Sequence, residues 1–109
     1  MRRFKVVLSL EAEQDLDDIV SYIADHDSVE RALFVAARVE EAVAALATFP
    51  ERGAYPKELL DHGIRDFREV FFKPYRLIHR ILPDTVAVVL IADGRRDMRA
   101  LLTRRLLNA

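Results

Sequence analysis

The feature that most constrains the fold of this chain is an uninterrupted apolar run, Val86 to Ala92. The run is rich in β-branched side chains and is bounded by Pro83-Asp84 and Asp93-Gly94, which favour turns. It is far shorter than the roughly 20 residues needed to span a bilayer. The run therefore predicts a central strand over 85–92 with both of its faces covered.

Two further strands are predicted immediately before this run. Residues 64–72 and 75–82 are rich in β-branched and aromatic side chains, and Lys73-Pro74 separates them. Pro83-Asp84 separates the second of them from the strand over 85–92. Connections this short join antiparallel neighbours, so the three segments predict an antiparallel three-strand meander.

The N-terminal half has the spacing of two helices. Apolar side chains recur at helical intervals over 10–25 and 28–48, and Ser9 and Asp27 stand where N-caps belong. Because only three or four residues separate the helices, they predict an antiparallel hairpin. The stripe of the second helix expected to face the core is Val29, Ala32, Leu33, Ala36, Val39, Val43 and Leu46.

The remaining segments complete an α+β two-layer fold. Residues 3–8 predict a short N-terminal strand beside the third meander strand, and 50–63 predict a loop with one short turn of helix. Residues 97–107 predict a short C-terminal helix. The helical hairpin is expected to pack on one face of the sheet. At 109 residues the chain is one domain, 1–109.

Composition excludes several kinds of site. The chain has no Cys, which rules out disulfides, thiolate zinc sites and cysteine nucleophiles, and fits a reducing cytoplasm. His26, His62 and His79 lack metal-ligand spacing, and no glycine-rich phosphate loop occurs. Neither a signal peptide nor a membrane span is recognisable. We expect a cytoplasmic protein that uses no metal or cofactor and does not enter a membrane.

Charge is distributed unevenly along the chain. Residues 11–27 carry seven acidic side chains and no Lys or Arg, whereas residues 62–109 carry ten basic and five acidic side chains. The formal net charge of −1 conceals this asymmetry. The distribution predicts a molecule with an acidic helical face and a basic face.

Arginines on the meander and its exit are the candidate functional residues. They are Arg65, Arg68, Arg76, Arg80, Arg95 and Arg96. Arg76 and Arg80 are four residues apart, so they project to one face of their strand. Guanidinium groups gathered on an open surface would bind phosphate. The alternative is that Arg76 or Arg80 forms structural salt bridges with Asp66, Glu69, Asp93 or Asp97 across the sheet, and that His79 makes ordinary hydrogen bonds on the sheet.

The whole chain resembles a known family. The resemblance rests on Leu10–Leu16 with Tyr22-Ile23, on Tyr75–Ile81, on Val86–Ile91, on Gly94-Arg95-Arg96-Asp97 and on the leucines from Leu101 to Leu107. Together these segments resemble the RelE/ParE superfamily, the toxins of bacterial type II toxin–antitoxin pairs, often described as plasmid-stabilisation proteins. The fold that this resemblance implies agrees with the one assembled above.

The resemblance implies two alternative activities. ParE-like members poison DNA gyrase, whereas RelE-like members cut mRNA on the ribosome with basic residues and a late proton donor. This chain keeps the strand arginine as Arg76 and the basic residue after the glycine as Arg96. It has Leu102 where such a nuclease has a tyrosine, and Phe67 and Glu69, on either side of Arg68, where the nuclease has lysines. These departures favour the gyrase inhibitor.

Two alternatives stay open beside the gyrase inhibitor. One is a ribosome-dependent mRNA endonuclease that uses Arg76, Arg96, His79 and Arg68. The other is an inactive module that only binds an antitoxin. The resemblance implies a cognate antitoxin as partner, of the ribbon-helix-helix type, whose tail covers the toxin. We expect Tyr22, Phe34 and Val35 on the hairpin to contact it; the alternative for Phe34 is packing on the sheet.

Overall fold

Strands and helices follow one another in the predicted order, in a computed structural model that describes residues 3–107. The elements are β1 (Lys5–Leu8), α1 (Leu10–His26), α2 (Val29–Ala45), α3 (Lys57–Leu60), β2 (Phe67–Phe72), β3 (Tyr75–Ile81), β4 (Thr85–Asp93), α4 (Met98–Leu102) and a π-helical turn η1 (Thr103–Leu107). The α+β prediction is confirmed. Among the described residues, no helix has the length and apolar character to cross a membrane.

The sheet has the strand order β1-β4-β3-β2. β2, β3 and β4 pair antiparallel as a meander, and β1 pairs parallel with β4 through residues 85–88. Both the meander and the position of the N-terminal strand beside the third meander strand are therefore confirmed. β4 is an interior strand, as its continuous apolar sequence predicts.

The hairpin differs from the prediction in one cap and in the rotation of α2. Ser9 caps α1 as expected, but Ser28, not Asp27, caps α2 by accepting a hydrogen bond from the Arg31 N–H. The side chains of α2 that enter the core are Ala32, Val35 and Val39. Val29 and Leu33, which were expected there, are each 63% exposed. The predicted stripe is therefore rotated about the helix axis.

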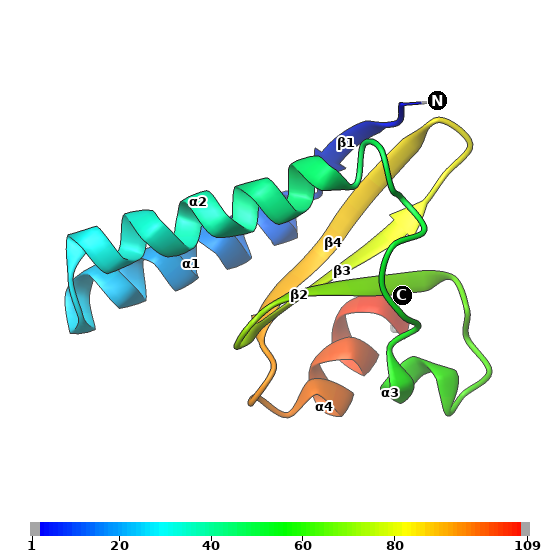
Figure 1. The fold of residues 1–109 in the computed structure, drawn as a ribbon. Helices are drawn as coiled ribbons and strands as arrows, with labels where there is room; N and C mark the ends of the chain where they lie inside the picture. The colour runs from blue at the N-terminus through cyan, green and yellow to red at the C-terminus, as the bar shows by residue number, and fades with distance from the viewer. Residues whose placement is uncertain (1–2, 108–109) are drawn as a thin grey trace.

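Helices cover both faces of the sheet (Figure 1). The α1–α2 hairpin packs on one face, over Leu77, Val86 and Val88. The short helices α3 and α4 pack on the other face, over Ile78 and Leu90. The sheet thus has a hydrophobic core on each side, and this second covering explains why β4 has no polar side.

A β-bulge in β4 exchanges the two faces of the strand. His79 pairs with Val88, but Ile78 pairs with Leu90, so β4 contains one extra residue, Val89. Val86 and Val88 face the hairpin before the bulge, and Ile91 faces it afterwards. The apolar run therefore serves both cores in turn.

The side chains of Asp15 and Arg105 bind the backbone of β4 beyond the end of β1. The Asp15 carboxylate accepts a hydrogen bond of 3.0 Å from the Ile91 N–H. Arg105 donates to both Asp15 oxygens at 3.0 and 3.1 Å and to the Val89 carbonyl at 3.0 Å. This half-buried ion pair joins α1 and η1 to the edge of β4.

A loop over 48–54 lies along the outer edge of β2. Ala54 and Glu69 exchange two backbone hydrogen bonds, of 2.8 and 3.3 Å. Gly53 makes this approach possible, because its φ is +90° and a Cβ atom there would lie 1.9 Å from the Glu69 carbonyl oxygen.

A buried charge cluster holds α3 on the sheet. Arg76 on β3 donates from NH1 and NH2 to the two carboxylate oxygens of Glu58 on α3, both at 2.8 Å. Its Nε donates to Glu69 on β2 at 2.7 Å. All three residues are buried. A forked guanidinium–carboxylate pair is among the strongest polar contacts in proteins, so this cluster fixes α3 against the meander.

We expect Arg76→Met to lower the free energy of unfolding by about 3–5 kcal/mol, because it leaves Glu58 and Glu69 buried without their cation. The matched control is Arg80→Met on the same strand, where the arginine is exposed, and there the change stays within about 0.5 kcal/mol. Urea denaturation measures both. Equal effects of the two substitutions would show that the cluster does not stabilise the fold.

Candidate functional site

Arg76, the central candidate of the sequence analysis, is not available to a ligand. Each of its three guanidinium nitrogens already donates to Glu58 or Glu69. The two hydrogen bonds to Arg76 lower the pKa of Glu58 to about 2. Burial outweighs the single bond to Arg76 and raises the pKa of Glu69. The expectation that Arg76 lies on an open surface is therefore wrong, and the salt-bridge alternative with Glu69 is confirmed.

Gly94, in the Gly-Arg-Arg-Asp motif, lies directly over this cluster. A Cβ atom there would come within 2.9 Å of the Arg76 Cδ and 3.2 Å of the Pro74 carbonyl oxygen. The Gly94 N–H donates to that same carbonyl at 2.7 Å. The glycine therefore lets the exit of β4 cross the Arg76 side chain closely.

Three of the other arginines gather at one corner of the sheet. Arg65, Arg68 and Arg80 line a pocket of about 360 Å³, and Glu51, Tyr55, Asp66 and Ile81 complete it. Arg68 lies over the Tyr55 ring, with its Cζ 4.6 Å from the ring centroid. We call this pocket the arginine pocket.

Arg95 and Arg96 lie in a different pocket, also of about 360 Å³, between α1 and the end of β4. Its walls include Tyr22 of α1, Tyr75 of β3 and Asp93 of β4. Arg95 donates to both oxygens of Asp93, at 2.6 to 3.2 Å, and these hydrogen bonds lower the pKa of Asp93. We call this pocket the tyrosine pocket.

The two pockets lie at opposite ends of β3. Tyr75, in the tyrosine pocket, pairs with Asp93, whereas Arg80 and Ile81, in the arginine pocket, pair with Ala87 and Val86. At about 3.3 Å per residue, the length of β3 separates them by about 20 Å. The expectation that all six arginines share a single open surface is therefore wrong.

The residues proposed for RNA cleavage are not brought together. His79 is completely buried, and its Nε2 donates to the Pro50 carbonyl at 2.8 Å. Leu102, where a related nuclease would have a tyrosine, is the last residue of α4 and is buried in the core between α4 and the sheet. Neither residue shares a cleft with Arg96. Within residues 3–107 no group of three or more His, Asp or Glu side chains could hold a metal ion.

The hairpin residues expected to contact an antitoxin fall into two groups. Tyr22 is 63% and Phe34 is 47% exposed, so both are accessible. Phe34 also lies near Phe72, with ring centroids 6.2 Å apart, and Arg31 and Arg38 flank its ring. Val35 is buried in the hairpin core, so its expected exposure is wrong.

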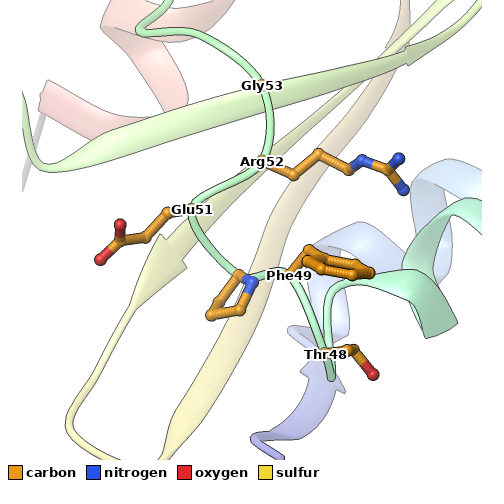
Figure 2. A pocket seen from close by; sticks show the side chains of 6 residues that line it. Thr48, Phe49, Glu51, Arg52 and Gly53 are labelled. Atoms are coloured by element: carbon orange, nitrogen blue, oxygen red, sulfur yellow. The ribbon is translucent and has the colours of Figure 1, made fainter. Parts of the chain in front are cut away.

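Another pocket, of about 580 Å³, is lined by the loop from Thr48 to Gly53. Figure 2 shows Phe49 and Arg52 on one side of this loop and Glu51 on the other. The Arg52 guanidinium lies 5.7 Å from the Phe49 ring centroid.

Sequence reasoning missed two partners of the arginines. Glu58 and Tyr55, which hold Arg76 and Arg68, lie in the segment predicted as a loop. The one available signal was an acidic residue next to two leucines, Leu59 and Leu60, in a stretch otherwise punctuated by Pro and Gly.

His79 is expected to make the fold less stable as the pH falls below about 6.5. Burial lowers its pKa below the ordinary value, so the unfolded chain takes up a proton at higher pH than the folded chain. The stabilising contribution is complete above about pH 6.5 and is lost as the pH falls below that value. The free energy of unfolding, measured in urea at several pH values, should fall accordingly.

The control for this measurement is His79→Gln, which keeps a donor for the Pro50 carbonyl but does not titrate. Glu69, with its raised pKa, contributes with the opposite sign, so the difference between wild type and variant is the quantity to follow. Parallel pH profiles for the two proteins would contradict the prediction.

Known proteins resemble this chain in both sequence and fold. Residues 6–98 match the family model described as ParE toxin of type II toxin–antitoxin system, parDE. Among curated proteins, Toxin ParE3 of Caulobacter vibrioides is 26% identical over 101 residues, which is 93% of this chain and 97% of that protein.

Two solved structures have the same fold. A chromosomal ParDE toxin–antitoxin system from P. aeruginosa aligns with a TM-score of 0.69 and 18% identity, over 84% of this chain and 96% of that one. The toxin–antitoxin complex RelBE2 from Mycobacterium tuberculosis aligns with a TM-score of 0.57 and 23% identity, over 85% and 93%. With most of its length matched by the family model, the chain belongs to the ParE toxin family of type II toxin–antitoxin systems.

Proposed function

We propose that this toxin inhibits bacterial growth in the cytoplasm by poisoning DNA gyrase, and that a cognate antitoxin neutralises it. Membership of the ParE family supports the proposal. The observation that carries it is the state of Arg76, whose guanidinium is fully engaged by Glu58 and Glu69.

Cleavage of RNA at a 2′-hydroxyl needs a base, an acid and a free cation around one phosphate. In this chain Arg76 is occupied, His79 is buried beneath the 48–54 loop, and Leu102 cannot donate a proton. Among the described residues, these three positions therefore do not supply the base, acid and free cation that RNA cleavage needs. A toxin that acts by binding its target needs no such set.

The direct test of the target uses purified gyrase and relaxed plasmid DNA. We expect micromolar protein to inhibit supercoiling and to accumulate cleaved plasmid, and preincubation with the cognate antitoxin to prevent both. Primer extension on translated mRNA should give no new ends. Codon-specific ends with unaffected gyrase would support the endonuclease instead. Normal growth on expression without the antitoxin would leave only the inactive antitoxin-binding module.

We further propose that an antitoxin of the ribbon-helix-helix type covers the hairpin and the tyrosine pocket with its tail. The exposed face of α1 carries Glu11, Glu13, Asp17, Asp18 and Asp25, which suit a basic partner. Tyr22 and Phe34 add exposed aromatic surface, the residue type that often dominates binding energy. Since Tyr22 and Arg96 line one pocket, a tail bound there would also cover Arg96.

Single substitutions on the hairpin test this surface. Tyr22→Ala and Phe34→Ala should each weaken antitoxin binding by about tenfold or more, because each removes an exposed aromatic anchor. The control is Phe49→Ala, which removes an equally exposed aromatic side chain from the 48–54 loop outside the hairpin. Isothermal titration calorimetry with the antitoxin tail measures the affinities. A loss for Phe49→Ala as large as for Tyr22→Ala would contradict this location.

A further inference from the structure

Two arginines of the arginine pocket have no direct partner within the described chain. The side chains of Arg65 and Arg80 are exposed and make no hydrogen bond or ion pair within residues 3–107. The carboxylates of Glu51 and Asp66 line the same pocket and also lack such partners there. Opposite charges therefore face a common space of about 360 Å³ without pairing with one another.

The third arginine of this pocket is held in place. Arg68 donates from NH2 to the Tyr55 hydroxyl at 3.2 Å and from NH1 to the Gly53 carbonyl at 3.4 Å. Its guanidinium also lies over the Tyr55 ring. These contacts hold one cationic wall of the pocket in place, while Arg65 and Arg80 have no internal partner that a ligand would have to displace. A site that is partly fixed in advance loses less conformational entropy on binding.

The mixture of charges limits the chemistry of the ligand. A ligand that is only anionic would pair with the arginines but leave the carboxylates of Glu51 and Asp66 without a hydrogen-bond donor. A nucleotide combines a phosphate, which accepts hydrogen bonds from guanidinium groups, with base amino groups, which donate to carboxylates. The volume of the pocket lies in the range of sites that bind small molecules, and Ile81 adds an apolar wall.

We propose that the arginine pocket binds one nucleotide unit of single-stranded DNA, with Arg65 and Arg80 on the phosphate and Glu51 and Asp66 on the base amino groups. The inference rests on the proposed function, in which the target is gyrase with DNA bound. It adds that the toxin contacts the DNA of that complex directly. Because the tyrosine pocket lies at the other end of β3, a tail bound there leaves this site open.

The experiment measures binding of fluorescein-labelled single strands of twelve deoxycytidines to the full chain, without gyrase, by fluorescence anisotropy at several salt concentrations. We expect the double variant Arg65→Gln/Arg80→Gln to bind at least tenfold more weakly than wild type. Its plot of log K against log salt should be shallower by about 0.7 for each phosphate that the variant no longer neutralises. Circular dichroism verifies that the variant is folded.

The matched control is Arg31→Gln/Arg104→Gln, which removes the same charge from two exposed arginines outside the pocket and should change affinity less than threefold. A second variant, Glu51→Gln/Asp66→Asn, tests the base contacts. Wild type should prefer twelve deoxycytidines to twelve thymidines, because thymine has no exocyclic amino group. The second variant should lose this preference.

Four results would overturn the inference: no binding by wild type, equal losses in the control, equal affinity of wild type for both strands, or tighter binding of the matching cytidine RNA. The gyrase assay is independent of all four. If the protein inhibits gyrase but does not bind the strand, only this inference is overturned. If the protein binds the strand but leaves gyrase active, the proposed function and the contact with gyrase-bound DNA are overturned, and the nucleotide site itself remains.

Discussion

The contact between Arg76 and two buried glutamates is the interaction on which the rest of the architecture depends. It joins β3 to β2 through Glu69 and to α3 through Glu58, so one guanidinium holds three elements together. Burying such a cluster is costly unless each donor is satisfied, and here all three nitrogens are. The same contact places α3 over the second face of the sheet and withdraws from solvent the arginine most similar to a nuclease residue.

Patterns that depend on neighbours in sequence were predictable. The spacing of apolar residues in α1, the serine at position 9 and the two turns around β3 each specify local structure, and the meander follows from them. The apolar run of β4 predicted that both faces of this strand are covered, but it did not predict which helices cover the second face. A bulge at Val89 depends on how β4 pairs with β3, and no local signal marks it. The rotation of α2 was missed because Leu33 and Val35 are equally apolar, and only packing against the sheet distinguishes them.

The sequence indicated which arginines are candidates for the site, but it did not indicate how they are arranged in space. The placement of Arg76 and Arg80 on one strand was predicted correctly. Whether each arginine is available to a ligand, however, depends on partners that are distant in sequence. Glu58 is 18 residues before Arg76, and Tyr55 is 13 residues before Arg68. Both lie in a segment of Pro and Gly whose path over the sheet is decided by tertiary contacts such as the Ala54–Glu69 pair. For this reason six similar arginines divide into one structural residue and two separate surfaces.

The parallel pairing of β1 with β4 has a consequence for the order in which the fold is completed during synthesis. The first strand can find its partner only after residues 85–88 have emerged from the ribosome, and Asp15 meets Arg105 later still. A nascent chain therefore cannot close its sheet until β4 has been translated. A partly synthesised chain therefore lacks the complete sheet that carries the arginine pocket and the tyrosine pocket.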